Sequence, residues 1–267
     1  ADGTKQEETP APAEGAQKQG ESSIVLFLVR HARGVHNYAA GLHGVEAYKK
    51  WEYEDARWVR APPRGWCTRD ALLRGQLDDA GKAQAAKLQS EFAKANIKLD
   101  VVLCSPLTRT LQTATIAFKH SAAPIVAVEC LREAYGAHPC DRRRPRSVIQ
   151  GEFPKVDMTK IAKGEDPLWL NSEKRACADV VAGGSSFALI AIPQNKSVIQ
   201  RAAKFVQVLR ALPATTTHIA VVSHGVFLDC LLRYCLQVPQ GFDTSHFGNA
   251  EVRALRLELG ATKQGSH

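Results

Sequence analysis

Three short, largely apolar runs constrain the fold of this chain more than any other feature of its sequence. They span residues 24–29, 99–104 and 218–223, and they are rich in β-branched residues and too short for buried helices. Segments 77–94 and 197–212 lie between the runs and place apolar residues at helical spacing. Unbroken apolar strands that alternate with amphipathic helices are typical of a parallel sheet covered on both faces. We therefore expect an α/β fold, a three-layer αβα arrangement around a mainly parallel sheet.

Local signals along the chain predict further elements. Directly after the second run, Ser105 is expected as the N-cap of a helix and Pro106 as its first residue. Residues 125–128 predict another strand, residues 226–236 a helix, and residues 249–259 alternate as an edge strand does. Each central strand is thus followed by a helix, as parallel pairing requires.

We expect the chain to form one domain between two polar tails. Residues 1–23 contain no aromatic residue and hardly any large aliphatic one, so a disordered N-terminal tail is expected. The domain is expected to span residues 24–259, and residues 260–267 form a polar C-terminal tail. Between about 125 and 200, Gly, Pro and basic clusters interrupt the periodicity. An inserted lid or cap is expected there.

Composition limits the partners and the compartment of the protein. A net charge of +8 favours anionic partners, which include phosphate esters as well as nucleic acid and acidic lipid. No apolar run approaches the roughly 18 residues that a membrane-spanning helix needs, so we expect a soluble protein. The seven cysteines are scattered without C-x-x-C pairs, which indicates free thiols in a reducing compartment. We expect a cytoplasmic location, and because the chain starts at Ala, a processed organellar presequence stays open.

Groups that bind phosphate stand at the ends of the three predicted central strands. Arg30 and His31 close the first strand, Arg109 comes shortly after the second, and His224 closes the third. In open α/β sheets ligands bind outside the carboxyl ends of the strands, so we expect these side chains to converge. Guanidinium groups match phosphate oxygens with paired donors, and a neutral imidazole can attack phosphorus and leave again. His31 is therefore the expected nucleophile of a phosphoryl-transfer reaction, with Asn37 as a further neutral donor.

Such a reaction also needs an acid, because an alkoxide is a poor leaving group until it is protonated. Glu133 is the candidate for this role. It follows the apolar segment 125–128, which is expected to end near the same edge of the sheet.

Four motifs together resemble the histidine phosphatase superfamily, in its phosphoglycerate-mutase-like branch. They are Arg30-His31-x-x-Gly34-x-x-Asn37, Ser105-Pro106-x-x-Arg109-x-x-x-Thr113-Ala114, Leu131-x-Glu133 and Ser223-His224-Gly225. The resemblance implies a mainly parallel sheet flanked by helices, a phosphohistidine on His31, and Glu133 as the proton donor. It also implies that phosphate is bound by Arg30, Arg109, Asn37 and His224. We add Gly225 and Tyr135 as further expected substrate-binding residues.

Residues near the nucleophile separate two interpretations within this family. Ala32, Gly34 and His36 resemble the pattern of broad phosphatase-like members of plants and fungi, which favours a histidine-acid-type phosphatase that hydrolyses phosphomonoesters. The segment 133–136 is instead similar to the mutase segment that holds the substrate carboxylate. The basic run Arg142–Arg146 supplies charge for a second anionic group of the substrate. A phosphoglycerate mutase therefore stays as an alternative.

A further alternative, from another class, is a catalytically silent module that binds anions or RNA. A cysteine-based phosphatase does not fit, because the C-x5-R count from Cys140 to Arg146 contains a repelling Asp141 and a Pro145 without an amide proton. A site with two arginines also repels a divalent metal ion. We therefore expect a metal-independent enzyme without a cofactor, acting on a small phosphorylated substrate, with no obligatory nucleic acid and no membrane. The identity of the substrate and the oligomeric state stay open.

Overall fold

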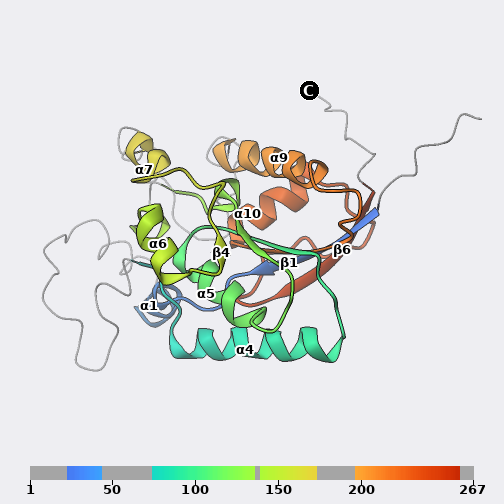
Figure 1. The fold of residues 1–267 in the computed structure, drawn as a ribbon, viewed down its shortest axis with the longest axis horizontal. Helices are drawn as coiled ribbons and strands as arrows, with labels where there is room; N and C mark the ends of the chain where they lie inside the picture. Colours follow the sequence, from blue (N-terminus) through green and yellow to red (C-terminus); the bar gives the residue numbers. More distant parts are fainter. Residues whose placement is uncertain (1–22, 44–73, 136–138, 173–195, 259–267) are drawn as a thin grey trace, which may run out of the picture.

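The computed structural model describes residues 23–43, 74–135, 139–172 and 196–258, which Figure 1 draws as a coloured ribbon. The two expected polar tails lie outside the described residues, except that Ser23 already belongs to a strand. Much of the later part of the expected insertion, residues 173–195, lies outside them as well.

Strands in the described part of the chain form one six-stranded sheet in the order β4-β3-β2-β5-β1-β6. Their bounds are β1 Ser23–Arg30, β2 Val101–Cys104, β3 Ile125–Ala127, β4 Val156–Asp157, β5 His218–Ser223 and β6 Val252–Glu258. All neighbouring strands pair in parallel except β1 and β6, which are antiparallel. The three predicted central strands are confirmed as β1, β2 and β5, and the predicted edge strand is β6.

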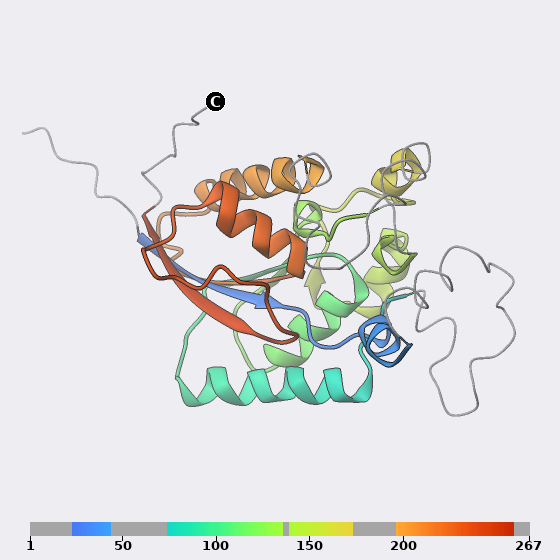
Figure 2. The same ribbon diagram turned by 180° about the vertical axis from the view of Figure 1, so that it is seen from behind.

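Helices cover both faces of this sheet, as Figures 1 and 2 show from opposite sides. Their bounds are α1 Val35–His43, α4 Asp79–Lys94, α5 Thr108–Ala117, α6 Arg146–Glu152, α7 Pro167–Ser172, α9 Lys196–Arg210 and α10 Gly225–Cys230. Helices α9 and α10 lie over one face, whereas α4 and α5 lie over the other. The expected α/β fold with helices on both sides of a mainly parallel sheet is therefore confirmed.

Strand β1 shows why its sequence is an unbroken apolar run. Leu26 and Leu28 pack with Phe205 of α9 on one face of the sheet, in the first core cluster. Phe27 and Val29 point to the other face and join the cluster that contains residues of α4 and α5. Because successive side chains of a strand point to opposite faces and both faces are covered, every position must be apolar.

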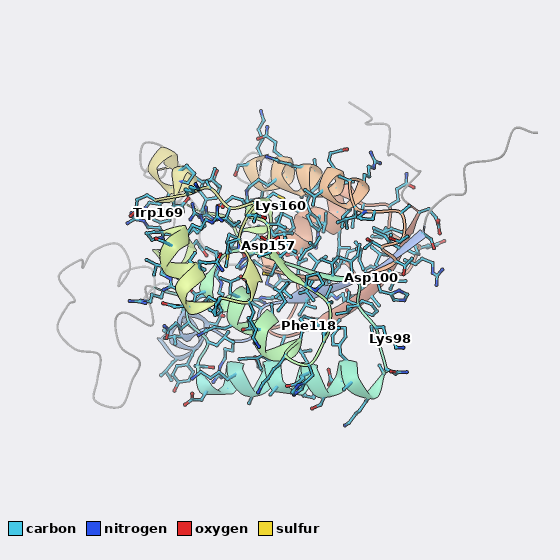
Figure 3. The ribbon with its side chains drawn as sticks, in the orientation of Figure 1. Lys98, Asp100, Phe118, Asp157, Lys160 and Trp169 are labelled. Atoms are coloured by element: carbon cyan, nitrogen blue, oxygen red, sulfur yellow. The ribbon has the colours of Figure 1, made fainter. Side chains whose placement is uncertain are left out.

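The amino-terminal ends of the central strands are closed by a single carboxylate. Asp100, labelled in Figure 3, precedes β2 and accepts hydrogen bonds from the backbone N–H groups of Thr217 (2.7 Å) and His218 (2.8 Å) at the start of β5. This contact fixes β2 against β5. The contact lies at the amino-terminal ends of these strands, whereas the phosphate-binding residues are expected at the carboxyl ends.

Two local predictions are wrong in detail. Helix α5 begins at Thr108 with Leu107 as its N-cap, not with Ser105 and Pro106 as N-cap and first residue. The Ser105 hydroxyl lies before the helix and contacts the imidazole Nε2 of His224 at 2.8 Å. The predicted helix over residues 226–236 is also divided, since α10 is followed by a π-helical segment, Leu231–Cys235.

The expected insertion contributes to the sheet itself. Strands β3 and β4 lie within residues 125–200, and β4 adds the edge strand next to β3. Helices α6 and α7 are its other described regular elements, with two short 3-10 turns, Glu129–Leu131 and Pro139–Asp141. None of the helices in the described ranges has both the length and the apolar character that crossing a membrane requires. The boundaries of the domain and of the insertion stay predictions.

Gly81 allows α4 to pack against the loop that follows β1. Asp78 is the N-cap of α4 and accepts a hydrogen bond from the N–H of Gly81 at 2.7 Å. A Cβ atom at position 81 would lie 2.0 Å from the carbonyl oxygen of Arg33. Because the obstructing atom belongs to the backbone, a side chain at this position requires the helix or the loop to move.

We predict that Gly81→Ala destabilises the protein by about 1–3 kcal/mol, the usual range for overpacking, although alanine is the better helix former. Urea unfolding measures the change. The matched control is Gly151→Ala in α6, where the added Cβ meets no atom within 4 Å. This control should raise the free energy of unfolding by up to about 1 kcal/mol. Equal shifts in the two variants would contradict the prediction.

Candidate active site

The parallel register of the sheet brings the predicted strand ends to one level. Arg30 of β1 pairs with Ser223 of β5, and the N–H of His31 donates to the carbonyl of Ser223 at 2.9 Å. The next residues therefore face each other, and the ring centroids of His31 and His224 lie 5.1 Å apart. The structure thus brings together side chains that are separated by almost 200 positions in the sequence.

His31 is buried, and its two ring nitrogens have different partners. Nδ1 lies 2.8 Å from the carbonyl oxygen of Ala32, which can only accept a hydrogen bond. Nδ1 therefore carries the proton, and the lone pair of the neutral ring is on Nε2. The Nε–H of Arg109 donates to this Nε2 atom at 3.2 Å. A nucleophilic lone pair thus faces a guanidinium group.

The electrostatic environment keeps both central imidazoles uncharged. Burial lowers the pKa of His31 well below its ordinary value, and the positive charge of Arg109 lowers it further. The pKa of His224 is lowered in the same way, first by burial and then by Arg109. A neutral imidazole has a free lone pair, so this environment favours nucleophilic chemistry near neutral pH.

His224 has one nitrogen that the described residues do not satisfy. The Ser105 hydroxyl contacts Nε2 of His224 at 2.8 Å and accepts the N–H of Leu107 at 3.4 Å. Nδ1 of His224 is buried without a hydrogen-bond partner among the described residues. A buried polar atom without a partner is costly, and in the tautomer that carries the proton on Nδ1 an oxygen atom of a ligand would satisfy it.

Arg109 is held rigidly by the 3-10 turn Pro139–Asp141. Its Nη1 donates to the carbonyl of Cys140 at 2.9 Å, and its Nη2 lies 2.5 Å from the Asp141 carboxylate. Burial alone would lower the pKa of Arg109, but the charge and hydrogen bond of Asp141, together with the smaller effects of Cys140 and Glu133, outweigh burial, and the pKa is raised. The guanidinium therefore stays charged, with its Nε–H directed at His31.

Glu133 lies at the start of α10, beside His224. Its carboxylate accepts hydrogen bonds from the backbone N–H groups of Ala134 (2.8 Å) and Val226 (3.3 Å). Burial raises the pKa of this carboxyl, and the negative charge of Asp141 raises it further. The residue as a whole is partly exposed. Glu133 is therefore a carboxyl that holds its proton to a higher pH than an exposed glutamate does.

The backbone that carries Glu133 is fixed by Arg201 of α9. The guanidinium of Arg201 donates to the carbonyl groups of Cys130, Arg132 and Glu133. Burial lowers the pKa of Arg201 to about 10, which leaves it charged at neutral pH. A charge that donates to three carbonyl groups within residues 130–133 holds this loop in one conformation.

The remaining predicted residues differ in their positions. Asn37 lies on α1, and its side-chain oxygen accepts the N–H of Gly34 at 3.0 Å, beside the loop of His31. Gly225 is the first residue of α10, and a Cβ atom there would lie 2.4 Å from the ring of His246. The contacts described for Tyr135 are with the guanidinium groups of Arg132 and Arg201, at 5.5 and 5.3 Å from its ring, and not with His31.

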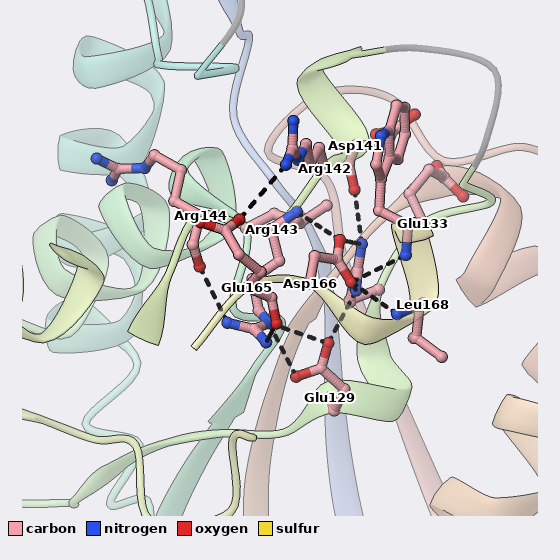
Figure 4. A network of polar contacts seen from close by, with 12 residues as sticks. Glu129, Glu133, Asp141, Arg142, Arg143, Arg144, Glu165, Asp166 and Leu168 are labelled. Atoms are coloured by element: carbon pink, nitrogen blue, oxygen red, sulfur yellow. Dashed lines mark hydrogen bonds and ion pairs between the residues drawn. The ribbon is translucent and has the colours of Figure 1, made fainter. Parts of the chain in front are cut away.

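The basic run Arg142–Arg146 is occupied by protein partners, as Figure 4 shows for its first three arginines. Arg143 is buried and pairs with Glu129 at 3.2 Å, and Arg144 pairs with Glu152 at 2.5 Å. The other two contacts are weaker, from Arg142 to Glu165 at 3.4 Å and from Arg146 to the carbonyl of Ile161 at 3.3 Å. The run mainly holds its own segment together.

Other residues of the motifs make structural hydrogen bonds and take no part in the proposed reaction. The Thr113 hydroxyl accepts the N–H of Ala32 at 3.0 Å and donates to the carbonyl of Arg109 at 2.7 Å. The Ser223 hydroxyl donates to the carbonyl of Leu131 at 2.7 Å. These contacts tie the His31 loop to α5 and the Glu133 loop to β5.

Sequence reasoning missed four residues at this site. In the sequence analysis Asp141 served only as an argument against a cysteine-based mechanism, although it is an acidic residue directly before the basic run. Arg201, Asp229 and His246 carry no motif, and Arg201 and His246 lie more than 65 positions from Glu133 and Arg30, which they contact, so no local signal reveals them. Within the described ranges, no group of three or more His, Cys, Asp or Glu side chains is arranged to hold a metal ion.

Comparison with known proteins identifies relatives of this chain. The family model described as Histidine phosphatase superfamily (branch 1) matches residues 73–156 and 158–264. A phosphoglycerate mutase-like protein of Arabidopsis thaliana is 29% identical over 262 residues, covering 86% of this chain and 83% of that protein. A protein of Schizosaccharomyces pombe named a probable phosphatase is 28% identical over 168 residues, covering 61% of this chain and 68% of that protein.

A solved structure shows the same fold. The phosphoglycerate mutase of Bacillus anthracis superposes with a TM-score of 0.51 at 16% identity, covering 90% of each chain. At this identity the likeness concerns the fold alone.

The lowered pKa values of His31 and His224 predict an acid-sensitive fold. Unfolded imidazoles take up protons below about pH 6.5, whereas the buried ones resist protonation, so the stability present above this pH is lost as the pH falls. Each histidine contributes about 1.4 kcal/mol of loss between pH 7.5 and 5.5.

His224→Gln should therefore lose about 1.4 kcal/mol less stability than the wild type over the same interval. Urea unfolding at the two pH values measures this difference, and all other titrating groups are shared by the two proteins. An equal loss in both proteins would show that His224 is protonated in the folded state.

Proposed function

Because this chain belongs to branch 1 of the histidine phosphatase superfamily, we propose that it hydrolyses a phosphomonoester through a phosphohistidine on His31. One observation carries the proposal. The Nδ1–H of His31 donates to the carbonyl of Ala32, which leaves the Nε2 lone pair facing Arg109 in a buried, neutral ring. An imidazole in this state is ready to attack phosphorus.

The phosphoryl group is bound by donors that converge around His31. Arg30 and Arg109 supply charge, and His224, with its proton on Nδ1, donates from a buried nitrogen that has no partner among the described residues. Asn37 and the backbone at Gly225 complete the set. Fixed donors of this kind stabilise the charge that develops on the phosphoryl oxygens in the transition state.

The first step transfers the phosphoryl group to the enzyme. Nε2 of His31 forms a bond to phosphorus while the ester bond between phosphorus and oxygen breaks. The proton of Glu133 passes to the leaving oxygen, so an alcohol departs and a carboxylate remains. The raised pKa of Glu133 supports this role, because an acid must still hold its proton when the leaving group needs it.

The second step releases phosphate. The Glu133 carboxylate takes a proton from a water molecule, and the water oxygen forms a bond to phosphorus. The bond between phosphorus and His31 breaks, and its electron pair returns to Nε2. Inorganic phosphate leaves, and both His31 and Glu133 are back in their starting states. The cycle needs no metal ion, since two guanidinium groups already balance the charge that a metal ion would balance.

The partners of the basic run favour hydrolysis over the mutase alternative. A phosphoglycerate carries a carboxylate besides its phosphate, and the expected cations for it were Arg142–Arg146. Arg143 and Arg144 are engaged with Glu129 and Glu152. With these charges already paired, an uncharged alcohol is the better leaving group for this site.

The alternative of a silent binding module is opposed by the same geometry. An anion-binding site needs cations, but it does not need an imidazole of fixed tautomer or a carboxyl with a raised pKa. RNA binding that falls steeply with salt concentration, in a protein that hydrolyses no phosphomonoester, would favour that alternative.

His31→Ala should reduce hydrolysis of 4-nitrophenyl phosphate on the order of 10³-fold or more, because no other nucleophile replaces the imidazole. The assay is run with excess chelator. Wild type incubated with labelled phosphomonoester and quenched with an alkaline denaturant should also carry a phosphoryl group that is stable to alkali and labile to acid, which the variant lacks. His218→Gln, at the opposite end of β5, is the control for removal of an imidazole. Near-full activity of His31→Ala would exclude this mechanism.

Glu133→Gln should slow the hydrolysis of alkyl phosphates by about 10²- to 10⁴-fold and that of activated aryl phosphates much less. The reason is that a good leaving group departs without protonation. Steady-state rates for a series of leaving groups measure this dependence. Equal slowing across the series would remove Glu133 from the role of acid.

A further inference from the structure

The Arg30 side chain is held by the loop that contains His246 and Phe247, which belongs to none of the four sequence motifs. Its Nη1 donates to the carbonyl of Phe247 and lies 3.2 Å from Nε2 of His246, both in the segment between the π-helical turn and β6. Nδ1 of His246 lies 2.6 Å from the carboxylate of Asp229 on α10. Asp229 is 1% exposed, whereas the His246 side chain is 41% exposed. A buried carboxylate is thus connected to Arg30 through one imidazole.

Arg30 and Asp229 determine the direction of the two hydrogen bonds made by the His246 ring. A guanidinium can only donate, and an ionised carboxylate can only accept. Nε2 of His246 therefore accepts from Arg30, and Nδ1 donates to Asp229. This arrangement fixes the tautomer and the orientation of the ring, as carboxylates do for imidazoles that ligate metals or act in catalysis.

The packing of α10 fixes the position of the ring. A Cβ atom at Gly225 would lie 2.4 Å from Cε1 and 2.9 Å from Nε2 of His246, and 3.5 Å from Nε of Arg30. Gly225 and Asp229 are four residues apart, so they share one face of the helix. The His246 ring packs against Gly225 and is hydrogen-bonded to Asp229.

We propose that His246 and Asp229 are positioning residues that orient the Arg30 guanidinium for the phosphoryl group. The inference rests on the proposed function in that it assigns phosphate binding to Arg30. A free arginine side chain loses conformational entropy when it is immobilised, and a side chain that is already held avoids much of this loss on binding. Nε of Arg30 is buried without a partner among the described residues, so a donor remains for the ligand.

The charge of Asp229 supports the same role. Burial lowers the pKa of Arg30, and the carboxylates of Glu133 and Asp229 counter this effect. Glu251 contributes as a third carboxylate, and Arg109 opposes all three. Asp229 therefore helps to keep Arg30 charged and in place while no phosphate is bound.

Equilibrium binding of inorganic phosphate, measured by calorimetry, tests the proposal. His246→Phe keeps a ring on Gly225 but removes the acceptor, and it should raise the dissociation constant about tenfold, the loss expected for one charge-assisted hydrogen bond. Asp229→Asn should have a similar effect, and the double variant should be no worse than the more affected single variant. His218→Phe at the other end of the sheet is the matched control and should leave binding unchanged.

The decisive comparison is made in an Arg30→Ala background. If His246 acts through Arg30, His246→Phe should cause no further loss of phosphate affinity there. An equal loss with and without Arg30, or no loss in the wild-type background, overturns the proposal. Thermal unfolding shows whether each variant is folded, and if Asp229→Asn does not fold, His246→Phe in the two backgrounds decides the question alone.

Turnover provides a second readout. With 4-nitrophenyl phosphate, His246→Phe should raise KM by a larger factor than it lowers kcat, because Arg30 contacts the phosphate in the ground state as well. Phosphate binding requires no turnover, so the two proposals fail separately. A wild type that binds phosphate but hydrolyses no ester overturns the proposed function and leaves the role of His246 to be decided by the binding data.

Discussion

The parallel register between β1 and β5, with β2 on the far side of β5, is the constraint on which the rest of this site depends. It ends three strands at one level and places His31 and His224 with ring centroids 5.1 Å apart. Arg109 lies in the first turn of α5, the helix that starts after β2. The lowered pKa values of His31 and His224 would not arise without this convergence, because they depend on burial and on the charge of Arg109.

Charge compensation is the second principle of the site. Asp141 pairs with Arg109, and Asp229 reaches Arg30 through His246. Removing one member of a buried ion pair leaves the other charge without compensation, so these carboxylates are as much a part of the site as the arginines. They also keep each guanidinium in one orientation, and the phosphoryl group then meets donors that are already arranged.

Predictions from the sequence were right where a signal is local and wrong where a side chain has a distant partner. The apolar runs identified β1, β2 and β5, because strands buried on both faces must be apolar throughout. Ser105 is a good helix cap by its local sequence, but its hydroxyl is taken by His224, 119 residues away. The basic run offered charge for an anion, but Arg142, Arg143 and Arg144 each pair with a carboxylate of the protein.

The sequence by itself determined the α/β class, the family resemblance and the identity of the candidate nucleophile, phosphate-binding residues and acid. These depend on hydrophobic period and on motifs of a few residues, which are readable one segment at a time. Only the tertiary structure decided which nitrogen of His31 carries the proton, what raises the pKa of Glu133, and that Asp229 and His246 support Arg30. Such properties arise from burial and from atomic contacts, some of them between segments more than 65 positions apart, and no hydrophobic period or short motif encodes them.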